Sequence, residues 1–283
     1  MRPLIPAFGR PLAVDSYLHR RNPSVKFAVV LMVSAAMMAV FDPWTPAILY
    51  LAAIPAVRFA GAVPWRTLAW AQVPFALFGL SLLMVNAMTR RGEVIAQVGP
   101  LELTGEGLSI GASLAIRTLL IGTLSVGFVL TTDGARLMIS LYQHARLSPR
   151  VTYAVLAGYR LLEQLPEQWQ TIRQAQAVRE PHRPERGGMT RVRSSARLPR
   201  SARVLTRAAF TTLVMTLRRG ERMSIALETR GLGAGPRTIF RPVPLDHRDG
   251  AFALVVLAAV GAVLLLAWRA GWLAGWGALG VFG

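Results

Sequence analysis

Five long apolar runs constrain this chain more than any other feature. They cover residues 25–41, 45–63, 68–88, 109–130 and 250–272, and each is close to the roughly 20 residues that a helix needs to cross a bilayer core of about 30 Å. A spanning segment must satisfy its own backbone hydrogen bonds in lipid, so helices are the expected form. The runs predict an all-α integral membrane protein with about five transmembrane helices.

The basic residues predict how these helices are oriented. The chain has 32 Lys and Arg against 14 Asp and Glu, a net charge of +18, and positively charged loops stay in the cytoplasm. Five spans with a cytoplasmic N-terminus place most of these cations inside, including Arg20, Arg21 and Lys26, whereas the outer side receives Arg90, Arg91 and Arg269. We therefore expect a multi-pass protein of the cell membrane.

The region between the fourth and fifth runs is too long to be a simple loop. We divide the chain into residues 1–131 (N-terminal cytoplasmic segment and four spans), 132–249 (a cytoplasmic helical region) and 250–283 (the last span and C-terminus). In the middle region, Ser148-Pro149 favours the start of one long amphipathic helix. After a Pro-, Ser- and Arg-rich connector, a second helix is expected to stop at Gly231, because glycine readily takes the positive φ of a helix C-cap.

The two predicted cytoplasmic helices end on the same residue pattern. Residues at i, i+3, i+4 and i+7 share one helix face, and these positions are Ile172, Ala175, Gln176 and Arg179 in the first helix and Met223, Ala226, Leu227 and Arg230 in the second. A small alanine permits close approach, and a guanidinium binds carboxylates bidentately. The faces therefore suit a partner with an acidic groove, although arginines at helix C-termini also simply complement the helix dipole.

Several classes of site are not indicated by the sequence. The chain has no cysteine, and its four histidines are scattered, so we expect neither a metal site nor a cofactor. No phosphate-binding G-x-x-x-x-G-K-[ST] loop and no Ser/His/Asp constellation is present, so we do not expect an enzyme. Arg117 lies inside the fourth run, where a charge is costly. It is either a functional or subunit contact or a structural one that holds the helices together.

Several motifs, in order over nearly the whole chain, resemble the transmembrane (T) component of energy-coupling factor (ECF) transporters. "SYLHRRNPSVKF" (16–27) is similar to the family's Asp-Pro-Arg-x-Lys segment, with Asn22 in place of the usual Asp. "LAIRTLLIGTLSVGFVLTT" (114–132) resembles the family's Arg-containing span. "YRLLEQLPEQWQTIRQAQAVRE" and "RRGERMSIALETRG" resemble its two coupling helices, which normally close on Ala-Arg-Gly. Here they close on Val178-Arg179-Glu180 and Thr229-Arg230-Gly231.

The resemblance implies a membrane scaffold that transmits the motion of two cytoplasmic ATP-binding ATPase subunits to a small substrate-binding (S) membrane subunit. It implies uptake of a vitamin, a vitamin precursor, or cobalt or nickel, with ATP hydrolysed by the partner subunits. The ATPase contacts would be made by Ala175, Arg179, Ala226, Arg230 and Gly231.

Two alternatives compete with this hypothesis. The arginine-rich connector would suit a membrane-anchored nucleic-acid-binding protein, but it lacks interleaved aromatic residues, and we expect no nucleic-acid partner. A self-sufficient secondary transporter would explain the spans, but no carboxylate lies within any of them and no inverted repeat is evident among them.

Overall fold

A computed structural model describes residues 14–90, 92–98, 101–145, 147–179, 202–231 and 242–272 of the chain. The chain folds into two compact units. The first, which we call the membrane unit, contains Met1–Ser140 and Pro242–Gly283. The second, the helix-pair unit, contains Leu141–Arg241.

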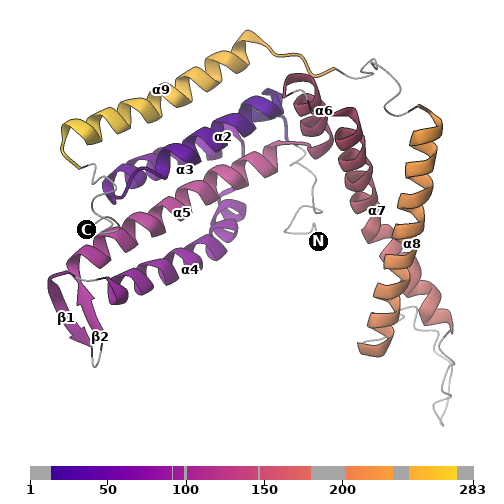
Figure 1. The fold of residues 1–283 in the computed structure, drawn as a ribbon, viewed down its shortest axis with the longest axis horizontal. Helices are drawn as coiled ribbons and strands as arrows, with labels where there is room; N and C mark the ends of the chain where they lie inside the picture. The colour runs from indigo at the N-terminus through magenta and orange to yellow at the C-terminus, as the bar shows by residue number, and fades with distance from the viewer. Residues whose placement is uncertain are drawn as a thin grey trace. The chain divides into compact units, whose positions relative to one another are not determined.

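The membrane unit consists of apolar helices and one small hairpin (Figure 1). Its elements are α1 (Tyr17–Arg20), α2 (Pro23–Met37), α3 (Trp44–Ala60), α4 (Trp65–Thr89), β1 (Val94–Val98), β2 (Leu101–Thr104), α5 (Gly105–Thr131), the first part of α6 (Gly134–His144) and α9 (His247–Arg269). Within the unit, α5 contacts α4 and also α2 and α3, while α9 packs against α2 and α3.

A helix covers most of every predicted span, and within the described parts of the chain three helices are long and apolar enough to cross a bilayer. These are α4, α5 and α9, with 25, 27 and 23 residues. Helices α2 and α3 have only 15 and 17 residues, which at 1.5 Å per residue reach about 22–26 Å. The membrane-protein class is supported by length and composition, whereas the count of five spans stays a prediction.

The structure is mostly helical, as predicted, and adds one hairpin that the sequence did not lead us to expect. Strands β1 and β2 form an antiparallel pair in which Val98 lies opposite Leu101 and Val94 opposite Thr104, with a register shift between Val94 and Ala96. Valine, isoleucine and threonine favour a pleated strand over a helix. The segment between the apolar runs of α4 and α5 therefore pairs its backbone groups as a hairpin.

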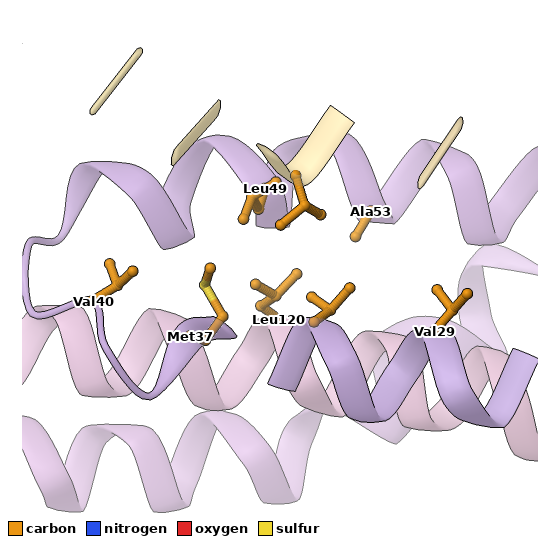
Figure 2. Close-up of a cluster of buried hydrophobic side chains, with 8 residues drawn as sticks. Val29, Met37, Val40, Leu49, Ala53 and Leu120 are labelled. Carbon is orange, nitrogen blue, oxygen red and sulfur yellow. The ribbon is translucent and has the colours of Figure 1, made fainter. Parts of the chain in front are cut away.

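The core of the membrane unit lies between α2, α3, α5 and α9. Figure 2 shows Val29, Met37 and Val40 facing Leu49 and Ala53, with Leu120 of α5 completing the contact. Outside this core, large apolar side chains of α4 and α9 are exposed, among them Leu77 (65%), Phe78 (59%), Leu254 (68%) and Val255 (64%). An exposed apolar belt on both outer helices is what a lipid-facing surface requires.

A close backbone approach joins α4 to α5, the most extensive helix contact of the unit. At Gly111 a Cβ atom would lie 2.9 Å from the Leu83 carbonyl oxygen and 3.0 Å from the Leu83 Cα. One turn later, Ala115 contacts Gly79 in the same way. Without a hydrophobic driving force in lipid, such small residues let helices gain dispersion energy by approaching closely.

The helix-pair unit contains the two long helices expected from the sequence, α7 (Pro149–Arg179) and α8 (Ala202–Thr229). Helix α7 begins at the predicted Pro149, in keeping with the preference of proline for the first helical position. Helix α8 ends at Thr229, and Gly231 has φ +74° and donates its N–H to the Glu228 carbonyl at 2.8 Å. The predicted glycine C-cap is confirmed.

Candidate functional site

Helices α7 and α8 pack as an antiparallel pair, as the linings of two grooves in the helix-pair unit show. One groove, of about 640 Å³, is lined by Arg150, Ala154, Gly158 and Leu161 of α7 with Gly220, Ser224 and Glu228 of α8. The other, of about 670 Å³, is lined by Gln164, Gln168 and Ala175 of α7 with Thr211, Met215 and Arg219 of α8. The start of α7 thus faces the end of α8.

The antiparallel arrangement separates the two matched faces. Ala175 shares a groove with Thr211, and Thr211 precedes Ala226 by 15 residues on the same helix, which corresponds to about 22 Å of helix length. The structure therefore does not bring Ala175 and Ala226 together. It places them towards opposite ends of the pair.

The predicted site residues differ in how fully the structure describes them. Ala175, Ala226 and Arg230 are exposed, and Arg230 lies in the turn that follows α8. Arg179 is the last residue of α7, but its side chain and all of Glu180 lie outside the described residues. At the second end, α8 stops at Thr229, and Arg230 and the Gly231 cap form the turn that follows.

Helix α8 also exposes an unusual amount of apolar surface for a basic helix. Phe210 (68%), Leu213 (65%), Leu217 (63%) and Ile225 (60%) are accessible. On α7, Leu162 is 63% exposed. Apolar side chains left uncovered in this number mark a surface that contacts another protein or a membrane.

Arg117 makes structural contacts at the turn between α2 and α3. Its Nη2 donates to the Val40 carbonyl oxygen, and its guanidinium lies 5.6 Å from the centre of the Phe41 ring. On the previous turn of α5, the Ser113 hydroxyl donates to the Asp42 carbonyl at 2.9 Å. These contacts fix the turn against the middle of α5, which supports the structural interpretation of this intramembrane charge.

A buried polar cluster at the start of α2 was not singled out from the sequence. We call it the Asn22 cluster, and its members are Arg21, Asn22, Lys26, Ser140 and Asp249, each at most 6% exposed. Lys26 Nζ donates to the carbonyls of Leu18 (3.0 Å) and Thr131 (2.9 Å). This contact joins the two N-terminal motifs, 16–27 and 114–132, that resemble the ECF family.

Asp249 connects the same cluster to the start of α9. Its Oδ1 accepts the Asn22 backbone N–H at 3.0 Å and lies 3.7 Å from Arg21 Nη1. Both partners of this ion pair are buried, so removing either one would leave an uncompensated charge. The signal available in the sequence was a carboxylate three residues into the last apolar helix, where a charge needs a partner.

The described residues show no grouping of three or more His, Asp or Glu side chains that could hold a metal ion. What these residues do offer is exposed apolar surface on α7 and α8 and buried polar contacts in the membrane unit.

Residues 15–238 match the family CbiQ, described as "Cobalt transport protein". An energy-coupling factor transporter transmembrane protein EcfT from Heliobacterium modesticaldum is 25% identical over 270 residues, covering 92% of this chain and 96% of that protein. The EcfT protein of Listeria innocua is 26% identical over 265 residues, covering 90% and 96%.

A third relative differs in its length and in its name. A putative ABC transporter ATP-binding protein of Bifidobacterium longum is 25% identical over 269 residues, which are 92% of this chain but 33% of that protein. The family match extends from α1 through both helices of the helix-pair unit. The chain therefore belongs to the CbiQ family and is a transmembrane component of the energy-coupling factor type of ABC transporter.

Proposed function

We propose that this protein couples ATP hydrolysis by two separate ATPase subunits to movement of a small substrate-binding membrane subunit. The imported substrate would be a vitamin, a vitamin precursor, or cobalt or nickel. The protein would span the cell membrane five times with a cytoplasmic N-terminus, and the helix-pair unit would lie in the cytoplasm. It would hydrolyse no ATP itself.

The observation that best supports this proposal is the antiparallel α7–α8 pair. The sequence gives each helix a face of the same design, with Ala175 and Arg179 on α7 and Ala226 and Arg230 at the end of α8, and Ala175 and Ala226 lie towards opposite ends of the pair. One face for each of two ATPase subunits is the simplest use of that arrangement. The similarity of this chain to part of a protein named as an ABC transporter ATP-binding protein supports an ATPase partner.

Physical chemistry predicts what each end contributes. A guanidinium that bonds a carboxylate bidentately is worth about 1.5–3 kcal/mol. The Arg230 end is the stronger candidate because it keeps the closing glycine of the motif, and Gly231 takes the positive φ of a helix C-cap. Glu180 follows Arg179 and would repel an acidic groove.

The test is recovery of partners with the tagged full chain from native membranes in mild detergent. We expect ATPase subunits and a small polytopic membrane protein to accompany the wild type. Arg230→Ala should weaken ATPase attachment roughly ten- to a hundredfold, because about 1.4 kcal/mol corresponds to a factor of ten. Arg179→Ala should weaken it less, and Arg230→Lys should restore only part, because an ammonium lacks the planar fork.

Arg218→Ala is the matched control. Arg218 is an exposed arginine of α8 and lies 12 residues before Arg230, about three turns of helix away from the end that we propose as the contact. It should attach ATPase subunits like the wild type. Unchanged recovery with both Arg179→Ala and Arg230→Ala would contradict the coupling role.

A further inference from the structure

The chain crosses between its two units at two places, which we call the passages. The side chain of Asn22 forms hydrogen bonds with residues at both of them. The chain leaves the membrane unit after Ser140 of α6 and returns at Pro242. We call Pro242–Asp246 the return segment. The Ser140 hydroxyl donates to Asn22 Oδ1 at 2.6 Å. Asn22 Nδ2 donates to the return-segment carbonyls of Pro244 (3.2 Å) and Val243 (3.4 Å).

The contacts of Asn22 with Ser140 and with Val243 are buried, and the contact with the Pro244 carbonyl is partly buried. Asn22 is 3% exposed, Ser140 0% and Val243 6%. Water cannot readily replace a buried hydrogen bond, and an unsatisfied group left behind would be costly. Both passages are therefore held firmly against the N-cap of α2 and do not behave as loose tethers.

The carboxamide of Asn22 suits both contacts at once. Its oxygen accepts from Ser140 and from the Ser24 backbone N–H at 3.0 Å, while its NH₂ group donates to two carbonyl oxygens. An ionised aspartate is an acceptor only, so it would place a second oxygen against those carbonyls. The two return-segment carbonyls therefore suit an asparagine at position 22, which can donate to them, and not an aspartate.

Further hydrogen bonds join other helices of the membrane unit to the residues around Asn22. Asp249 ties the start of α9 to the Asn22 backbone, and Lys26 ties the end of α5 to α2 through the Thr131 carbonyl. Consequently one short stretch of α2 and its N-cap, between Asn22 and Lys26, contacts four other parts of the unit. These are α5, α6, the return segment and α9.

We propose that Asn22 is a positioning residue for energy coupling, which makes both passages move as a single body so that motion of the helix-pair unit enters the membrane unit at one point. The inference rests on the proposed function. If the two passages were flexible and independent, rotation about their own backbone bonds would take up a displacement of the helix-pair unit. Because both passages are bonded to one buried carboxamide, the displacement is transmitted to the start of α2, the end of α5 and the start of α9.

The absence of cysteine from the 283 residues permits a direct test. Spin labels at Arg136→Cys on α6 and Leu245→Cys on the return segment, both exposed positions, report the separation of the two passages by double electron–electron resonance. The full chain with its co-purified ATPase subunits is measured in nanodiscs, nucleotide-free and after trapping with ATP and vanadate. We expect one narrow distance distribution that is the same in both states.

Two variants release one passage each. Asn22→Asp removes the donations to the return segment, and Ser140→Ala removes the hydroxyl that holds α6. Each should lose the narrow distribution and show a separation that changes with nucleotide. Asp15→Asn, which removes an exposed pair with Arg20 outside the cluster, is the control and should match the wild type.

A wild-type separation that changes with nucleotide would overturn the inference. So would Asn22→Asp and Ser140→Ala variants that lose thermal stability but keep the wild-type distribution in both states, because that is the result of a merely structural role. If the wild type recovers no ATPase subunits, the proposed function fails. The nucleotide-free comparison of wild type with Asn22→Asp then still tests whether Asn22 anchors both passages.

Discussion

The close approach of α4 and α5 at Gly111 leads to a prediction that separates packing from helix propensity. We compare Gly111→Ala with Gly261→Ala. Both positions lie inside helices of the membrane unit, but at Gly261 of α9 no atom lies within 4 Å of an added Cβ. At Gly111 the added Cβ would meet backbone atoms of Leu83 at 2.9 and 3.0 Å, and backbone cannot rotate away as a side chain can.

The expected magnitude follows from two opposing effects. Replacing glycine by alanine in a helix interior stabilises by about 0.5–1 kcal/mol, and this gain applies to both variants. Forcing one extra methyl group into a packed contact costs about 1–3 kcal/mol, and this cost applies to Gly111→Ala alone. The propensity gain cancels in the comparison, so Gly111→Ala should be about 1–3 kcal/mol less stable than Gly261→Ala.

The assay is reversible unfolding of the purified chain in mixed micelles, followed by circular dichroism as the denaturing detergent fraction increases. Gly261→Ala should unfold at or slightly above the wild-type midpoint, and Gly111→Ala clearly below it. Equal stability of the two variants would refute the reasoning, because it would mean that α4 and α5 do not approach as closely as the structure shows.

Three further predictions concern contacts elsewhere in the chain. Arg117→Met leaves the Val40 carbonyl without its donor and should destabilise the membrane unit by about 1–3 kcal/mol in the same unfolding assay; an unchanged midpoint would contradict the turn-fixing role. The hydrogen bond from Arg20 holds the pKa of Asp15 below its ordinary 3.8, so this pair stabilises the fold above that pH and is lost as the pH falls through the lower folded value. Arg20→Gln should raise the Asp15 pKa in a carboxyl NMR titration, and an unmoved titration would refute the pairing. Gly231→Ala forces a side chain into a φ of +74° and should cost about 1–2 kcal/mol, seen as faster hydrogen exchange in the last turn of α8, whereas wild-type exchange there would mean that the cap does not matter.

The sequence was sufficient for features that depend on local patterns. Apolar runs of bilayer length predicted the helices, because a membrane-spanning backbone has to satisfy its own hydrogen bonds. Pro149 and Gly231 predicted the start of α7 and the end of α8 because their allowed φ values are restrictive or permissive in known ways. The ordered motifs led to the family, which the match over residues 15–238 confirms.

The length of the first two helices was beyond local patterns. After Lys26 the run to residue 41 is apolar apart from Ser34, yet α2 ends at Met37. Its turn into α3 is fixed by Arg117, which lies 77 residues after Val40. Whether the helix continues through a short apolar segment or ends there depends on whether a buried donor can bond its free carbonyls. The spacing of apolar residues within the segment does not reveal such a donor.

Sequence alone determined the class of this protein, its long helices and the matched Ala–Arg ends of α7 and α8, because each depends on residues close together in the chain. Only the tertiary structure decided that those ends lie apart on an antiparallel pair. It also decided that Asn22 contacts residues 118 and more than 220 positions away. Such contacts depend on how the helices pack, and no pattern within one segment encodes the carbonyl that a distant carboxamide will face.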